Sequence, residues 1–145
     1  MKETITRSAS ETSALGGAFA RGLVPGDVVA MVGTLGSGKT CFVAGACAAL
    51  GVTGTVTSPT FAIINEYPAP FGTVEHIDMY RIGSRREVAE LGIEEYFRPR
   101  CICFVEWADA VEDLLPPAHF RVAIAHGADE GERRITVAAP PRGGM

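Results

Sequence analysis

The 145-residue chain has no apolar run of the ~18 residues that a membrane-spanning helix needs. Its first residues are polar and do not show the pattern of a secretory signal peptide. We therefore expect a cytoplasmic protein. Basic residues are not in excess, because Lys and Arg number 13 against 17 Asp and Glu, a formal net charge of −4. This balance argues against bulk nucleic-acid binding by the chain alone, and it leaves a local basic patch open.

Metal-binding cysteine patterns are also missing, since none of the four cysteines belongs to a Cys-x-x-Cys pair. Cys101 and Cys103 lie two apart in a strand-like run, so their side chains face the same side and are poorly placed to form a disulfide. We expect free thiols in a reducing compartment and no zinc site. His76, His119 and His126 do not cluster with Cys or acidic residues at ligand spacing, and we assign them no metal role.

Internal repeats and interdomain linkers are absent as well. A chain of this length buries roughly 70% of its unfolded surface, which is enough for one core. We therefore predict a single domain over residues 1–139, followed by a disordered tail at 140–145.

The most informative segment is Gly33–Thr40, which matches the phosphate-binding pattern G-x-x-x-x-G-K-[ST]. The apolar run Asp27–Val32 before it predicts a buried strand. The Ala-rich run Cys41–Leu50 after it predicts a helix closed by Gly51. The motif therefore has the strand, glycine loop and helix that it needs to bind a nucleotide phosphate.

Each residue type in this loop has a physical role. Gly36 and Gly38 tolerate positive φ and bring backbone amides close to an anion, which the positive end of the next helix also favours. Lys39 is expected to reach the β- and γ-phosphates, and Thr40 to hold Mg²⁺ through its hydroxyl. The predicted nucleotide-binding loop comprises Thr34, Leu35, Gly36, Ser37, Gly38, Lys39 and Thr40.

Apolar periodicity predicts the remaining elements. Strands are expected at 2–7, 61–67, 74–78, 101–105, 120–124 and 133–137. Helices are expected at about 8–21 and 85–91, with helical turns at 93–97 and 108–114. A loop is expected at 51–60, with turns at 68–72 and 125–131. Because 101–105 is apolar on both faces, we predict an α/β fold whose mixed sheet is parallel at its centre and flanked by helices.

Two acids lie where predicted strands end, which is where ligands bind in open α/β sheets. Asp78 follows one strand and Glu106 follows another. One is expected to bind Mg²⁺ and the other to orient the attacking water, so Lys39, Asp78 and Glu106 are the candidate catalytic residues. Each acid taken singly has the alternative role of capping the next turn.

Other candidates surround these acids. Ser58 and Thr60 lie where many phosphate-loop enzymes have a switch segment, and a plain turn is an equal alternative. Trp107, the only Trp, either stacks near the nucleotide or partner or belongs to the core. Arg81 pairs with a carboxylate or a phosphate. For contacts to the base, Ser10, Thr12 and the Arg133–Arg134 region remain open candidates.

Several segments together resemble the TsaE (YjeE-type) family of bacterial ATPases over about residues 8 to 137. The segments are Gly33–Thr40, Thr57–Phe61 with Asn65–Tyr67, His76–Arg81, and Glu106-Trp107. The phosphate loop alone is generic, whereas the combination and order of the other segments are specific to this family.

The resemblance implies an ATPase component of tRNA threonylcarbamoyladenosine synthesis, acting with TsaD and TsaB on the adenosine beside the anticodon. It implies that Ser58 to Phe61 form a switch region and that Trp107 lies next to the nucleotide. It also implies that Asp78 and Glu106 are the acidic site residues, with Glu106 favoured over Asp78 as the magnesium ligand. One residue departs from the pattern: Thr34 stands where the family commonly has Asp, which puts a catalytic role of that Asp in doubt here.

Two alternatives follow from the phosphate loop alone. A small nucleotide or metabolite kinase is disfavoured because the chain has no Arg-rich lid and little length for an acceptor domain. A GTP-driven switch is disfavoured because no Asn-Lys-x-Asp segment is present.

Overall fold

A computed structural model describes residues 2–33, 38–53, 64–79, 86, 89–90, 92–107 and 112–140. Along the chain the strands are β1 (Lys2–Thr6), β2 (Val28–Gly33), β3 (Ile64–Ala69), β4 (Gly72–Asp78), β5 (Cys101–Glu106), β6 (Phe120–His126) and β7 (Arg133–Ala138). The α-helices are α1 (Ala9–Ala20) and α2 (Lys39–Ala49), and the short 3₁₀ helices are η1 (Ile93–Tyr96) and η3 (Glu112–Leu114).

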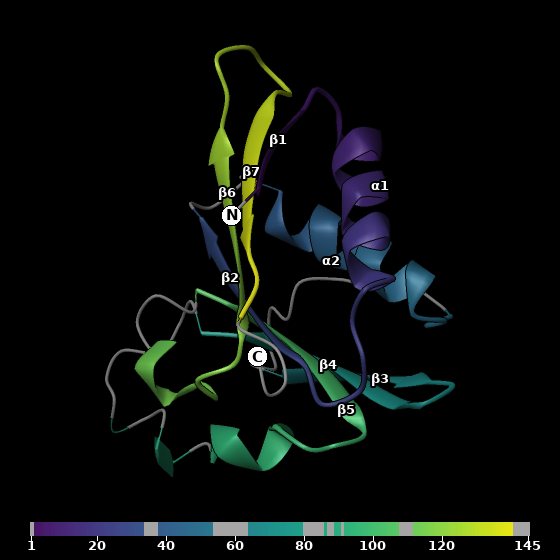
Figure 1. Cartoon of the computed structure of the whole chain (residues 1–145), viewed down its shortest axis with the longest axis vertical. Coiled ribbons are helices and arrows are strands. Elements are labelled where there is room, and N and C mark those ends of the chain that lie inside the picture. Colours follow the sequence, from purple (N-terminus) through teal and green to yellow (C-terminus); the bar gives the residue numbers. More distant parts are fainter. Residues whose placement is uncertain are drawn as a thin grey trace.

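The seven strands form one sheet in the order β1-β7-β6-β2-β5-β4-β3 (Figure 1). The central strands β6, β2, β5 and β4 are parallel to one another. The outer pairs β3–β4, β6–β7 and β1–β7 are antiparallel. This arrangement confirms the predicted mixed sheet with a parallel centre.

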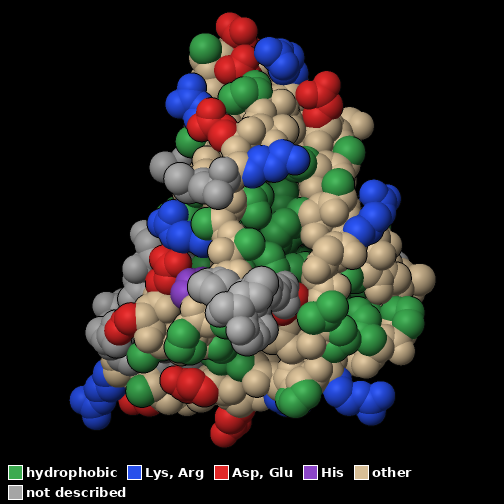
Figure 2. Space-filling view, in the orientation of Figure 1, with side chains coloured by type: hydrophobic (Ala, Val, Ile, Leu, Met, Phe, Trp, Pro, Cys, Tyr) green, Lys and Arg blue, Asp and Glu red, His purple; other side chains and the backbone are tan. Residues whose placement is uncertain are grey.

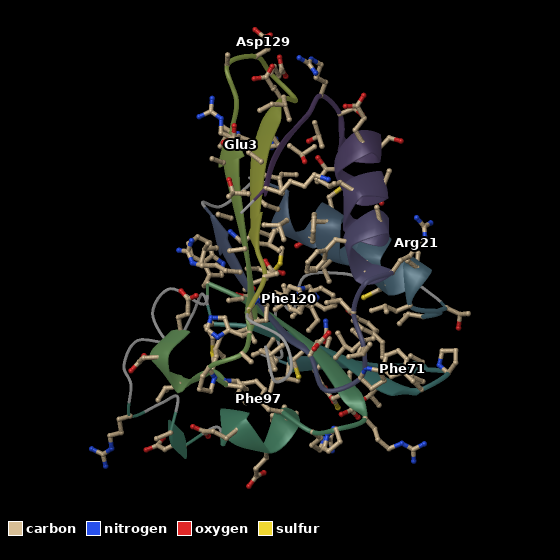
Figure 3. All side chains as sticks on the ribbon, viewed as in Figure 1. Glu3, Arg21, Phe71, Phe97, Phe120 and Asp129 are labelled. Atoms are coloured by element: carbon tan, nitrogen blue, oxygen red, sulfur yellow. The ribbon has the colours of Figure 1, made fainter. Side chains whose placement is uncertain are left out.

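The two innermost strands, β2 and β5, are buried on both faces, which explains their continuous apolar sequences. One face of the sheet packs against α1 and α2 through Val29, Met31 and Phe104. The other face carries a second core cluster that includes Val28, Ala30 and Val105. Figure 3 shows Phe120 among the side chains at the centre of the molecule, where its ring meets Phe19 edge-on at 5.5 Å.

The helices α1 and α2 cross in close contact because glycines line the crossing. A Cβ on Gly16 would come within 2.1 Å of the Phe42 carbonyl oxygen, and one on Gly45 within 1.9 Å of the Ser13 carbonyl oxygen. Helix α1 begins after Ser8, whose hydroxyl accepts a hydrogen bond from the Glu11 amide. The crossing fixes α2, and therefore its first residue Lys39, against the sheet.

The turn predicted at 68–72 is wrong in extent. Strand β3 continues through Pro68 and Ala69, which pair with Thr73 and Gly72 of β4, so the turn itself is shorter. Proline is tolerated here because β3 is an edge strand and one side of its backbone needs no partner. The strands β6 and β7 also run slightly longer than predicted, to His126 and Ala138.

All four cysteines are free, as predicted. Burial raises the pKa of the Cys47 thiol to about 12, so that thiol is unreactive at neutral pH. No helix among the described residues has the length and apolarity that crossing a membrane requires. Most of the helix predicted at 85–91, and residues 141–145 of the predicted tail, lie outside the described residues.

Candidate nucleotide-binding site

The candidate site lies where the central strands end. Strand β2 ends at Gly33, β4 at Asp78 and β5 at Glu106. Asp78 and Glu106 are partners in the parallel register of β4 and β5, and Met31 of β2 is the partner of Glu106 on its other side. Register partners of neighbouring strands point to the same face, so the fold brings the two predicted acids together.

Lys39 is the first residue of α2 and is buried, with 5% of its surface exposed. Its ammonium Nζ donates a hydrogen bond of 2.6 Å to the carbonyl oxygen of Gly33, across the phosphate-loop segment. The same nitrogen lies 4.0 Å from the centre of the Trp107 ring, which is a cation–π contact. The lysine is therefore held at the carboxyl edge of the sheet, between the ends of β2 and β5.

Gly38 precedes α2 in a left-handed conformation, with φ of 108°, which glycine adopts without strain. It provides no capping side chain, so the first amides of α2 are not occupied by a cap from this residue. Thr40, in the first turn, is half-buried. Amides at the positive end of a helix, beside a buried ammonium, favour an anionic ligand over a neutral one.

Glu106 and His76 form a buried pair that the sequence did not reveal. The side chain of His76 is fully buried and that of Glu106 is 3% exposed, and His76 Nε2 contacts the Oε2 atom of Glu106. The other ring nitrogen, Nδ1, is buried without a hydrogen-bond partner among the described residues. His76 thus fixes one of the two carboxylate oxygens of Glu106.

The sequence held one signal for the His76–Glu106 pair: His76 lies two residues before the predicted site residue Asp78, which places both side chains on one face of β4. Its acidic partner is 30 residues away in the sequence. Only the register between β4 and β5 brings Glu106 within reach, and spacing along the chain does not give that register.

Trp107 follows Glu106 in a left-handed conformation, with φ of 61°, and is the only described non-glycine residue with positive φ. A bulky aromatic residue rarely adopts this backbone, and such outliers are concentrated at functional sites. The partly buried side chain packs against the second core cluster, and its ring contacts Lys39. Trp107 therefore packs on the second core cluster and also contacts Lys39, while its stacking near a nucleotide or partner stays a prediction.

A hollow of about 170 Å³ adjoins the start of α2. We call it the Gly38 hollow, and it is lined by Ala9, Thr12, Gly38, Cys41, Gly131 and Arg133. Two of these residues, Thr12 and Arg133, belong to the open candidates for contacts with the base. Thr12 is buried, and its hydroxyl is hydrogen-bonded to that of Thr6 at 2.7 Å, so the wall of the hollow is fixed.

In the space-filling view apolar side chains are concentrated in the middle of the face, with Lys, Arg, Asp and Glu dispersed around them (Figure 2).

The oxygen groups at this edge fit Mg²⁺. The described residues contain no cluster of three or more His, Cys, Asp and Glu that would form a complete metal site. Magnesium does not need one, since it usually takes one or two carboxylates and fills its shell with phosphate oxygens and water. Glu106 and Asp78, with the Thr40 hydroxyl on α2, are donors of this kind.

A second buried acid lies on the opposite face of β4. Glu75 is fully buried and accepts a 2.9 Å hydrogen bond from the half-exposed Arg98. Burial, with Glu66 close by on β3, raises the pKa of Glu75 from an ordinary 4.5 to about 7. Because successive residues of a strand alternate between faces, the sheet separates this group from His76, and we assign it no part in the site.

The remaining predicted site residues cannot be placed. Those outside the described residues are Thr34, Leu35, Gly36, Ser37, Ser58, Thr60 and Arg81. Their assignments stay predictions from the sequence.

Comparison with known proteins identifies close relatives. Residues 6–135 match the family model described as "Threonylcarbamoyl adenosine biosynthesis protein TsaE". A protein of Bacillus subtilis named tRNA threonylcarbamoyladenosine biosynthesis protein TsaE is 40% identical over 134 residues, covering 92% of this chain and 83% of that protein. A protein of the same name from Treponema pallidum is 37% identical over 134 residues, covering 92% and 98%.

A solved structure shows the same fold. The crystal structure of YdiB from Bacillus subtilis superposes with a TM-score of 0.81 at 35% sequence identity. The match covers 97% of this chain and 86% of the solved one.

Proposed function

Because the chain belongs to the TsaE family, we propose that it is the Mg²⁺-dependent ATPase of threonylcarbamoyladenosine biosynthesis in tRNA. Two relatives that cover most of this chain are named for that pathway. The observation that carries the ATPase assignment is the buried Lys39 ammonium, held at the end of β2 beside the first turn of α2. A buried cation next to the first amides of a helix favours a polyphosphate over a neutral ligand.

The nucleotide would bind across the start of α2. Its phosphates are suited to the helix amides and Lys39, and the Gly38 hollow beside them offers a place for the nucleoside. Thr12 and Arg133 would then contact the nucleoside from α1 and β7. Neither side chain identifies the base as adenine, so the preference for ATP rests on family membership.

Hydrolysis is proposed as in-line attack of water on the γ-phosphate. Lys39 and the loop amides stabilise the negative charge that develops on the transferred group. Glu106 is the proposed magnesium ligand, with Thr40, and Asp78 the proposed residue that orients the water. Bound Mg²⁺ supplies charge neutralisation at the phosphates. His76 holds the Glu106 carboxylate in place for its role.

The proposed partners are TsaD and TsaB, and tRNA is reached indirectly through that complex. The formal charge of −4 supports the indirect contact, because direct tRNA binding needs many basic residues. On the one face that Figure 2 shows, basic and acidic side chains of the described residues are interspersed.

Lys39→Ala tests the proposal, and Lys2→Ala is a matched control because Lys2 is the only other lysine and is exposed in β1. Losing a preorganised charge contact costs ~3 kcal/mol of transition-state stabilisation, so ATP hydrolysis with Mg²⁺ should fall on the order of a hundredfold. Threonylcarbamoyladenosine formation by the reconstituted proteins should fall with it. Wild-type turnover in a folded Lys39→Ala protein would refute the assignment.

A further inference from the structure

We propose that Trp107 positions the Lys39 ammonium for phosphate binding, rather than contacting the nucleotide itself. This role rests on the proposed function, since it concerns the same site. Two contacts define the position of Nζ among the described residues. The Gly33 carbonyl oxygen accepts its hydrogen bond at 2.6 Å, and the Trp107 ring lies 4.0 Å away.

The chemistry of the ring suits this task. A carboxylate beside Lys39 would neutralise the ammonium and compete with phosphate for its N–H donors. An aromatic face attracts the cation through its quadrupole and accepts no conventional hydrogen bond. The Trp107 ring therefore confines the ammonium without itself neutralising its charge or accepting a conventional hydrogen bond from it.

The backbone of Trp107 supports the same interpretation. A left-handed φ of 61° at a tryptophan persists only where the surroundings over-determine it. Here the side chain packs against the second core cluster, and its ring also contacts the Lys39 ammonium. The strained residue thus connects the end of β5 directly to the first residue of α2.

A structural test needs no nucleotide. The chain has only two lysines, so lysine labelled with ¹³C at Cε gives two NMR signals, and Lys2→Ala assigns them. A ring 4.0 Å from Nζ should shift the Hε protons of Lys39 upfield. Trp107→Phe should keep a ring-current shift and Trp107→Leu should abolish it. A wild-type Lys39 signal at the free-lysine position would overturn the proposal.

Calorimetric binding of ATP and ADP with Mg²⁺ tests the consequence. Trp107→Leu keeps apolar volume against the core but lacks a π face, and should weaken binding of both nucleotides about tenfold. Trp107→Phe should remain within about threefold of wild type, since the cation–π contact survives. Unchanged affinity in the Leu variant, or equal losses in the Leu and Phe variants, would refute positioning through Lys39.

The two failures can be told apart. If wild-type protein shows the upfield Lys39 signal but binds no nucleotide, the proposed function falls and the role of Trp107 falls with it. If it binds nucleotide without that signal, only the role of Trp107 falls.

Discussion

The pair formed by Glu106 and His76 allows the chemical role of the acid to be separated from its structural one. Two substitutions of Glu106 are informative. Glu106→Ala removes the partner of His76, whose ring is fully buried. Glu106→Gln keeps the length of the side chain and an oxygen that can accept from the imidazole, but it removes the negative charge.

The expected stabilities follow from burial. After Glu106→Ala, His76 would have neither ring nitrogen paired among the described residues, because its Nδ1 has no partner there already. An unsatisfied buried polar group costs ~1–3 kcal/mol, and the truncation adds a cavity, so we expect a loss of about 3 kcal/mol in the free energy of unfolding. Glu106→Gln should change it by no more than about 1 kcal/mol.

Activity should follow a different order. If Glu106 holds Mg²⁺, both variants lose the charge and ATP hydrolysis falls on the order of a hundredfold in each. Urea unfolding followed by circular dichroism gives the stabilities, and ADP release at increasing Mg²⁺ concentrations gives the activities. Wild-type hydrolysis by Glu106→Gln, at unchanged Mg²⁺ dependence, would show that the carboxylate serves only as the partner of His76.

Two further predictions concern the scaffold. Gly45→Ala should lower the free energy of unfolding, measured in urea, by ~1–3 kcal/mol, because the new Cβ would lie 1.9 Å from the Ser13 carbonyl oxygen. Gly22→Ala is the control and should change stability little, since the nearest atom to its Cβ would be at an ordinary 3.6 Å. Equal effects of the two substitutions would contradict the tight helix crossing. The folded state favours protonated Glu75, so the free energy of unfolding should fall as pH rises from about 4.5 to about 7. The fall should be ~3 kcal/mol at most, and the ion pair with Arg98 should reduce it because Arg98 favours the charged carboxylate. Glu75→Gln should flatten that part of the profile, and an unchanged slope would assign the fall to other groups.

The parts of the fold that were predictable are those whose sequence is dictated by burial. The continuous apolar sequences of Val28–Gly33 and Cys101–Glu106 predicted buried parallel strands, and both lie at the centre of the sheet. Serine hydroxyls are good helix caps, and both Ser8 and Ser10 were candidates for the start of α1; the structure has Ser8 as the cap. Pro68 led to the wrong prediction of a turn, because proline is common in turns but is also tolerated in an edge strand such as β3.

The contacts within the candidate site were harder to predict from the sequence than the candidate residues themselves. Lys39, Asp78 and Glu106 follow from the motif and from the ends of strands, which are features of local sequence. The His76–Glu106 contact depends on the register of β4 against β5, and the Lys39–Trp107 contact depends on a left-handed backbone at a residue that seldom adopts one. Neither register nor positive φ at an aromatic residue is encoded in spacing along the chain.

These contacts also explain how a buried acid and a buried lysine can share one site without neutralising each other. Glu106 and Trp107 are consecutive at the end of β5, and each gives one charge of the site a separate partner. The Glu106 carboxylate is held by an imidazole, and the Lys39 ammonium is held by an indole ring and a carbonyl oxygen. Two separate charges are what a magnesium–nucleotide complex requires, because the acid attracts the metal and the lysine attracts the phosphates. A direct Lys39–Glu106 ion pair would remove both attractions, so the proposed function requires that Glu106 and Trp107 keep the two charges on separate partners.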